Sequence, residues 1–140
     1  ANALLDFSGL PRFDAVRPTD VQPAIRQLLD ESRALVERLT AIEQPVSWAN
    51  FAAPLADSIE HLSRAWGIVG HLHSVMDVPE WREAYNGMLP EVSRFYAELG
   101  QNLKLFAGYK AIRASAEFAT LNKSLHRLER FWTDQILYRL

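Results

Sequence analysis

Hydrophobic positions recur every three or four residues along most of the chain, which is the pattern of helices that bury one face. The first such stretch has its apolar positions at Val21, Ile25, Leu28, Leu35, Leu39 and Ile42. We expect Thr19 or Asp20 to cap the start of this helix, because both residue types accept hydrogen bonds from free backbone N–H groups. The helix is predicted to end at Gln44, because the residue before a proline avoids the α conformation.

A second helical pattern follows, with its apolar face at Phe51, Leu55, Ile59, Leu62, Trp66, Val69, His73 and Met76. Ser47 is the expected N-cap, and Asn50 three residues later makes a partial capping box without the usual Glu or Gln. Gly67 and Gly70 lie inside this helix, where each costs roughly 1 kcal/mol relative to alanine. The sequence therefore predicts either a neighbouring helix that crosses closely at these glycines or a kink there.

The third pattern is carried by Trp81, Tyr85, Met88, Val92, Phe95, Leu99, Leu103 and Phe106. Asp77 is the expected cap before it, and Gly100 and Gly108 are possible breaks, so residues 101–114 are predicted to form a separate helix. A last helix is expected to begin near Asn122. Its apolar positions are Leu125, Leu128, Trp132 and Ile136.

Residues 1–16 show no such period and read as an irregular arm. Leu10, Phe13 and Val16 are expected to pack on the core, because an apolar arm without a partner is an exposed liability. No strand-like alternation of useful length is present. The sequence therefore predicts an all-α fold, an antiparallel bundle of four to five helices, as one domain over residues 1–140 with helices over 17–140.

Composition narrows the function classes. Fifteen basic and seventeen acidic residues give a formal charge of −2, so no broad basic surface for nucleic acid or an anionic membrane is expected. No apolar run reaches the roughly 18–20 residues that span a bilayer. The chain has no cysteine, which excludes disulfides and thiolate chemistry within it.

The histidines do not form a recognisable metal site. They are His61, His71, His73 and His126. His71 and His73 are two residues apart and point to nearly opposite sides of a helix. Asp57 and His61 are four apart and could each offer a ligand, but zinc needs three or four and no third is identified. Glu60 precedes His61, which is the wrong order for H-E-x-x-H. We therefore name no metal, catalytic or cofactor residue, and expect His71 and His73 to be hydrogen-bonded histidines of the core or of a helix end.

Charged side chains are expected to be solvated rather than catalytic. The candidate acid–base glutamates are Glu60, Glu80, Glu83, Glu91 and Glu98. Acidic residues rarely lie buried without partners, so a solvated face explains them. On the polar side of the first helix, Arg33 and Glu37 are four residues apart and are predicted to form an ion pair. No phosphate-binding glycine loop and no G-x-S-x-G motif is present.

Several short motifs, in a fixed order, resemble a known family. They are Leu4-Leu5, Leu10-Pro11-Arg12-Phe13, Arg17-Pro18, Trp48 and Asn50 with Pro54-Leu55, His71-Leu72-His73-Ser74-Val75, Arg82-Glu83-Ala84-Tyr85, Leu89-Pro90 and Ala119-Thr120-Leu121-Asn122. This series resembles the N-terminal region of the oligopeptidase A branch of the thimet oligopeptidase/neurolysin family. The resemblance covers residues 4 to about 123, and the segment Phe131-Trp132-Thr133-Asp134-Gln135 departs from the family pattern.

The resemblance implies a zinc metallo-oligopeptidase that cleaves short peptides in the cytoplasm. It places H-E-x-x-H and the further glutamate ligand far downstream, so it assigns no catalytic residue here, and zinc belongs to the intact parent enzyme. The role it implies for this region is a non-catalytic helical wall of a deep channel. The chain would then be the N-terminal fragment of a larger peptidase, with the remaining catalytic part as its partner.

A different reading also fits the residues: a self-contained helical interaction module or homodimeric adaptor without enzymatic activity. Several capped helices and no active-site motif are compatible with it. If the chain is a wall segment, a face covered in the parent is expected to expose apolar side chains and to promote self-association of the isolated fragment.

Overall fold

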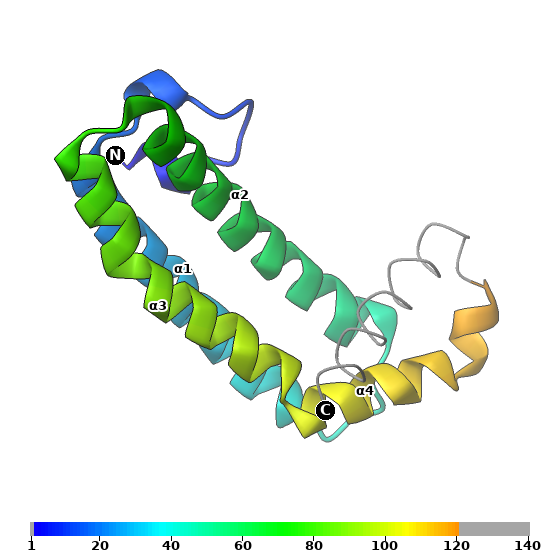
Figure 1. The fold of residues 1–140 in the computed structure, drawn as a ribbon. Helices are drawn as coiled ribbons and strands as arrows, with labels where there is room; N and C mark the ends of the chain where they lie inside the picture. Colours follow the sequence, from blue (N-terminus) through cyan, green and yellow to red (C-terminus); the bar gives the residue numbers. More distant parts are fainter. Residues whose placement is uncertain (1, 121–140) are drawn as a thin grey trace. The chain divides into compact units, whose positions relative to one another are not determined.

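The computed structural model describes residues 2–120, and within this range every regular element is helical (Figure 1). The long helices are α1 (Pro18–Thr40), α2 (Ala53–Met76), α3 (Pro79–Gly100) and α4 (Leu103–Arg113). The short helical turns are η1 (Ala3–Leu5), η2 (Phe13–Ala15), η3 (Trp48–Ala52) and η4 (Ala116–Thr120). The all-α prediction is confirmed, and so is the separate helix after Gly100. The helix expected from Asn122 lies outside the described residues.

The structure divides into two compact units. The first unit comprises Ala1–Ser32 and Asp57–Arg94, and the second comprises Arg33–Ala56 and the chain from Phe95 onward. Helices α1, α2 and α3 each contribute residues to both units. The single domain expected over residues 1–140 stays a prediction.

In the first unit, the predicted apolar faces form the core. Its buried side chains include Val21, Ile25, Leu28, Ile59, Leu62, Val69, Trp81, Met88 and Val92. Only two residues separate α2 from α3, so the two helices run antiparallel, and rings from both meet face to face. From α1, Arg26 reaches Glu91 of α3 with a nitrogen–oxygen distance of 3.5 Å. The helical period thus predicted these positions correctly.

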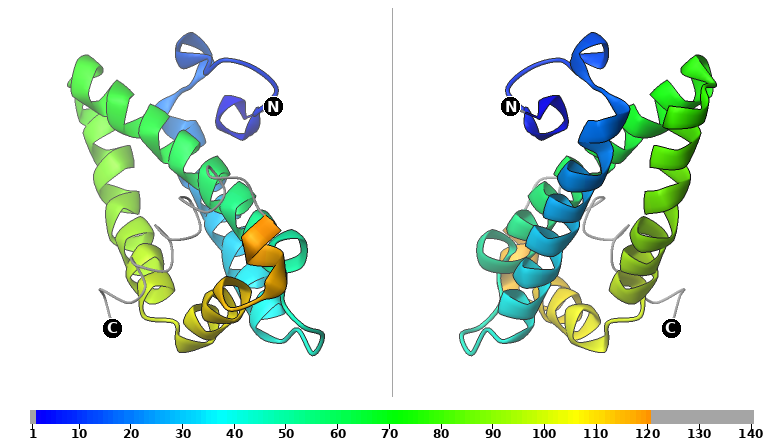
Figure 2. Two further views of the ribbon diagram at one scale, coloured as in Figure 1. Left: turned by 90° about the vertical axis from the view of Figure 1, so that its right-hand side faces the viewer. Right: turned by 90° about the vertical axis from the view of Figure 1, so that its left-hand side faces the viewer.

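The N-terminal arm packs against α2 as a folded loop that contains η1 and η2 (Figure 2). Phe7 stacks on His61 with ring centroids 4.1 Å apart, and Arg64 of α2 donates to the carbonyl oxygen of Gly9. Val16 is buried as predicted. The prediction is wrong for Leu10 and Phe13, because their side chains are 89% and 39% exposed.

The arm is internally braced around Asp6. Its carboxylate accepts hydrogen bonds from the backbone N–H and the hydroxyl of Ser8, at 3.0 and 2.5 Å, and lies 2.9 Å from the Arg12 guanidinium. The Ser8 hydrogen bonds, with the charge of Arg12 adding to them, hold the pKa of Asp6 below its ordinary value. The loop that carries Leu10 is therefore held by its own side chains and by the Arg64 hydrogen bond to Gly9, and the Leu10 side chain lies in solvent.

In the second unit, the core forms between η3, the start of α2, α4 and the end of α3. Its buried side chains include Phe51, Leu55, Phe95, Leu99, Leu105, Tyr109 and Ile112. Phe51 meets Tyr109 edge to face, with ring centroids 5.4 Å apart. Gly108 is also buried, and the Phe51 ring lies directly over its Cα.

The start of the second helical segment is capped as the sequence predicts. Ser47 accepts a hydrogen bond from the Asn50 backbone N–H at 3.2 Å, and the Asn50 side chain accepts one from the Ser47 N–H at 2.7 Å. Asn50 thus takes the place of the usual Glu or Gln in a complete capping box. The first turn, η3, is a wide π turn that leads directly into α2.

Three predicted helix ends were misplaced. Helix α1 begins at Pro18, and Asp20 lies inside its first turn, where the carboxylate accepts the Arg17 backbone N–H at 2.9 Å. The same helix ends at Thr40, before Gln44. Asp77 is not the cap of α3; it has a positive φ of 39°, and its carboxylate lies 3.0 Å from the Arg82 guanidinium.

The expected close helix crossing at the α2 glycines is also wrong. A Cβ added at Gly67 would meet nothing within 4 Å. At Gly70 it would meet only the Tyr85 ring, 3.9 Å away, which is an ordinary van der Waals distance. The neighbour of Gly70 is therefore a side chain rather than a helix backbone.

Candidate functional site

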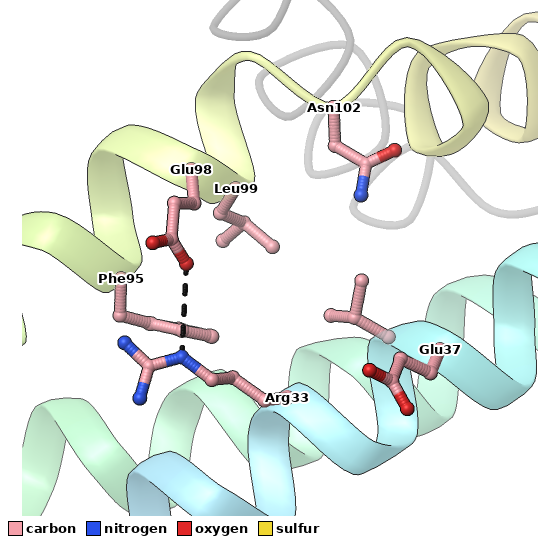
Figure 3. A pocket seen from close by; sticks show the side chains of 7 residues that line it. Arg33, Glu37, Phe95, Glu98, Leu99 and Asn102 are labelled. Carbon is pink, nitrogen blue, oxygen red and sulfur yellow. Dashed lines mark ion pairs between the residues drawn. The ribbon is translucent and has the colours of Figure 1, made fainter.

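A hollow of the second unit lies between α1 and α3 and has a volume of about 190 Å³ (Figure 3). Its lining residues are Arg33, Val36, Glu37, Phe95, Glu98, Leu99 and Asn102. Apolar side chains form part of the wall, and charged and amide groups form the rest. Such a surface can hold a side chain of a partner or ligand, since pockets of this kind combine apolar area with a few oriented polar groups.

Arg33 is the central polar residue of this hollow. Its Nε lies 3.6 Å from a carboxylate oxygen of Glu98, and its guanidinium carbon lies 5.8 Å from the centroid of the Phe95 ring (Figure 3). The predicted ion pair between Arg33 and Glu37 is therefore wrong. Asn102 serves the backbone instead: its side-chain oxygen caps α4 by accepting the N–H groups of Lys104 and Leu105, at 3.0 and 3.1 Å.

The hollow was not predicted from the sequence, for a physical reason. Arg33 and Glu37 were recognised only as polar positions of one helix, and the residues that complete the hollow are more than fifty positions away. Local spacing contains no information about such a meeting. The one local signal was Asn102, which follows the break at Gly100 and precedes a helix.

The three described histidines contact aromatic rings. His61 stacks on Phe7, and His71 meets the Phe13 ring edge-on with centroids 4.9 Å apart. His73 stacks on Tyr85 at 4.5 Å, and its Nδ1 atom is buried without a hydrogen-bond partner in the described structure. The prediction of a hydrogen-bonded histidine is therefore wrong at that atom.

Nothing in residues 2–120 assembles as a zinc site. No group of three or more histidine and carboxylate side chains within this range is placed to hold a metal ion. His126 lies outside the described residues. The described residues therefore do not fit the zinc that the resemblance assigns to the parent enzyme.

The candidate acid–base glutamates lie in solvent or in ion pairs. Glu60, Glu80 and Glu83 are exposed. Glu91 and Glu98 pair with Arg26 and Arg33, and all four of these side chains are at least one-third exposed. The solvated face predicted for these residues is confirmed.

Among the described residues, the helices lack an apolar stretch of the length that a membrane span requires.

Comparison with known proteins identifies the family of this chain. Residues 25–132 match the model of the neurolysin/thimet oligopeptidase N-terminal domain. The chain is 39% identical over 120 residues to oligopeptidase A of Haemophilus influenzae, covering 85% of this chain and 17% of that protein. It is 40% identical over 121 residues to oligopeptidase A of Salmonella typhimurium, covering 86% and 18%.

A plant relative gives the same result. The probable cytosolic oligopeptidase A of Arabidopsis thaliana is 38% identical over 128 residues, which are 91% of this chain and 18% of the relative. The chain thus spans less than a fifth of the length of these relatives. Because the family model matches well over half of the chain, the chain belongs to the neurolysin/thimet oligopeptidase family and corresponds to its N-terminal domain.

Proposed function

We propose that this chain is the non-catalytic N-terminal wall of a cytoplasmic zinc metallo-oligopeptidase that hydrolyses short peptides. The observation that carries the proposal is the match of residues 25–132 to the family's N-terminal domain, together with relatives named oligopeptidase A. In this proposal the partner of the chain is the remaining catalytic part of the enzyme, and the substrates are short peptides.

The described residues fit the role of a wall. Long helices with buried apolar faces make a stiff surface, and the charged side chains lie in solvent or in exposed ion pairs. The proposal places the zinc ligands in the part of the enzyme outside this chain, and it assigns no reaction step to residues 2–120. The wall acts by limiting which peptides reach the catalytic groups.

The cytoplasmic location is part of the proposal. One plant relative is named as probably cytosolic, which supports it. Another relative from Arabidopsis thaliana, 35% identical over 128 residues, is named as an organellar enzyme of chloroplasts and mitochondria. The same type of domain therefore serves enzymes in different compartments, and cell fractionation of the native protein tests the cytoplasmic location.

A chimeric enzyme tests the function directly. Oligopeptidase A of Escherichia coli is 39% identical to this chain over 121 residues, so this segment of the bacterial enzyme can be replaced by the present chain. We expect the chimera to hydrolyse a quenched short peptide, and the bacterial enzyme with the segment deleted to lose that activity. A folded but inactive chimera would reject the proposal and favour the self-contained interaction module. The isolated chain is expected to be inactive with added zinc.

A further inference from the structure

An exposed apolar surface marks the turn between α2 and α3. All seven residues from Ser74 to Glu80 are exposed. Three of them are apolar: Val75 is 59% exposed, Met76 51% and Val78 36%. Several apolar side chains exposed within one turn are typical of surfaces that another protein covers.

The arm adds a fourth apolar side chain to this surface. Phe13 is 39% exposed, and its ring meets His71 with centroids 4.9 Å apart. His71 and Val75 are four residues apart on α2, so they share one face of the helix. We name the group of Phe13, Val75, Met76 and Val78 the tip surface. All four residues belong to the first unit.

Two side-chain hydrogen bonds flank the turn that carries most of the tip surface. The Ser74 hydroxyl donates to the Gly70 carbonyl at 3.0 Å, and Asp77, with its positive φ, is bound by Arg82 at 3.0 Å. Asp tolerates this left-handed conformation better than most residues, so the turn is stable as it stands. A preformed surface loses little conformational entropy when a partner binds.

Carboxylates border the tip surface. Asp14, Glu80 and Glu83 are exposed, and no ion pair within residues 2–120 involves them. Of the nearby cations, Arg12 pairs with Asp6 and Arg82 with Asp77. Arg17, before the first helix, is the remaining nearby cation, so the three carboxylates outnumber it. Glu80 and Glu83 also line an open hollow of about 440 Å³. The border therefore favours a partner that carries lysine or arginine.

The same charges disfavour a second copy as the occupant. The first unit has eleven acidic residues and six arginines. In a symmetric dimer each surface patch meets its own copy, so the carboxylates of the border would face one another. Like charges placed opposite each other across an interface cost free energy.

We propose that the tip surface is where the rest of the oligopeptidase polypeptide docks, through an apolar area bordered by lysine or arginine. This inference rests on the proposed function. The relatives extend to more than five times the length that this chain matches, so the parent has ample surface to cover the tip. Docking removes the apolar side chains from water, and the basic border pairs with Asp14, Glu80 and Glu83.

The absence of cysteine permits a site-specific accessibility experiment. A single Val75→Cys substitution is made in the isolated chain and in the chimera with the Escherichia coli enzyme, and the rate of maleimide labelling of that peptide is followed by mass spectrometry. Ser93→Cys, at an exposed position of α3, is the matched reference. We expect labelling at position 75 to slow about tenfold or more in the chimera, because interface cores exclude solvent, while labelling at 93 is unchanged.

A charge variant tests the border. In the chimera, Glu83→Lys is expected to raise the labelling rate at position 75 several-fold, whereas Glu60→Lys, at an exposed site on α2, is expected to leave it unchanged. Equal labelling at position 75 in the isolated chain and in the chimera would overturn the proposal. Labelling of the isolated chain that slows with increasing protein concentration would also overturn it, in favour of a second copy.

The two proposals fail in different ways. A chimera that hydrolyses peptide while position 75 stays open rejects the tip surface alone, and a protected tip in an inactive chimera rejects the proposed function alone. If the chimera does not fold, the tagged chain is co-expressed with the remainder of the bacterial enzyme. Copurification lost in Met76→Glu and kept in Leu103→Glu supports the proposal, because Leu103 is an apolar residue of the second unit that is even more exposed than Met76, 66% against 51%. No copurification of the unaltered chain, or equal copurification of both variants, counts against it.

Discussion

Each of the two units contains a helical glycine that faces an aromatic ring, and the two contacts differ in how much room they leave. In the first unit, the Tyr85 ring lies flat between Trp66 and His73, with centroids 4.8 and 4.5 Å away, and passes Gly70 at an ordinary distance. In the second unit, the Phe51 ring presses on Gly108: an added Cβ would lie 2.7 Å from Cε2 and 2.8 Å from Cε1.

The difference follows from burial. Trp66, Tyr85 and His73 are each partly exposed, so their stack can adjust toward solvent. Phe51 and Tyr109 are each 1% exposed, so a displaced ring must push into other core atoms. A glycine next to an aromatic ring is therefore replaceable in the first unit and obligatory in the second. Four experiments test this contrast between the units, and a fifth concerns the N-terminal arm. They run from the largest expected effect to the smallest.

The largest effect is expected from emptying the second core. Phe51→Ala removes a ring that is 1% exposed, and should lower the free energy of unfolding by about 3–5 kcal/mol. Trp66→Ala should cost clearly less, because that ring is partly exposed. Urea denaturation followed by circular dichroism measures both. Equal losses would contradict the contrast between the two units.

Overfilling the second core should come next. Gly108→Ala places a methyl group against the buried Phe51 ring and should destabilise the chain by about 1–3 kcal/mol, despite the better helix propensity of alanine. Phe51→Leu in the same chain removes the far end of the ring and should recover part of this loss. A double-mutant cycle that shows no coupling would mean that the clash is relieved elsewhere.

The glycines of α2 should respond in the opposite direction. Gly67→Ala and Gly70→Ala introduce a methyl group into open space and into ordinary contact, respectively. Each should stabilise the chain by up to about 1 kcal/mol, because alanine favours the helix more than glycine does. A raised thermal midpoint for both variants is the expected reading. Destabilisation by Gly70→Ala would show that the Tyr85 stack is tighter than its geometry indicates.

Exposed ion pairs should not distinguish the units. Glu91→Gln removes the Arg26 pair of the first unit, and Glu98→Gln removes the Arg33 pair of the second. Both pairs are long and exposed, so each variant should lose about 0–1 kcal/mol. Similar small shifts in the urea midpoint would confine the contrast to ring packing. A large loss in one variant alone would add an electrostatic difference.

The smallest change concerns the arm. Ser8→Ala removes the side-chain hydrogen bond that contributes most to lowering the pKa of Asp6, so this pKa should rise toward its ordinary value. A lowered pKa stabilises the folded arm above about pH 4, and this contribution is lost as the pH falls through the pKa of the folded state. Carbon-13 NMR titration of the Asp6 carboxyl measures the shift. An unchanged midpoint would mean that Arg12 controls the group.

The sequence was informative about which positions of a helix are buried, although it misplaced both ends of α1 and the start of α3. The period of three and four placed Val21, Ile25 and Leu28 in the core, and Ser47 with Asn50 predicted the cap of the second helical segment. Family membership was also predicted, from the ordered motifs, and the match to residues 25–132 confirms it. Helix periodicity, capping and the order of motifs can all be determined from the amino-acid sequence alone.

The remaining errors lie where distant segments meet. Arg33 was assigned to Glu37 because only neighbours four residues away can be read from spacing, whereas its actual partner is Glu98. Leu10 was expected to dock because it is apolar, but its neighbours hold the loop instead, through the Gly9 carbonyl to Arg64 and Asp6 to Arg12. Gly67 has open space where a crossing helix was expected. Each outcome depends on tertiary placement, which no local pattern encodes.

The wide turn at η3 has a consequence for how this protein can evolve. A π turn closes with a bond from residue i to residue i+5, so η3 holds one residue more than an α turn. One residue lost within Trp48–Ala52 would tighten η3 into an α turn, and α2 would keep its orientation. Natural selection should therefore tolerate a one-residue deletion here better than in the middle of α2, where it turns the following segment by roughly 100°.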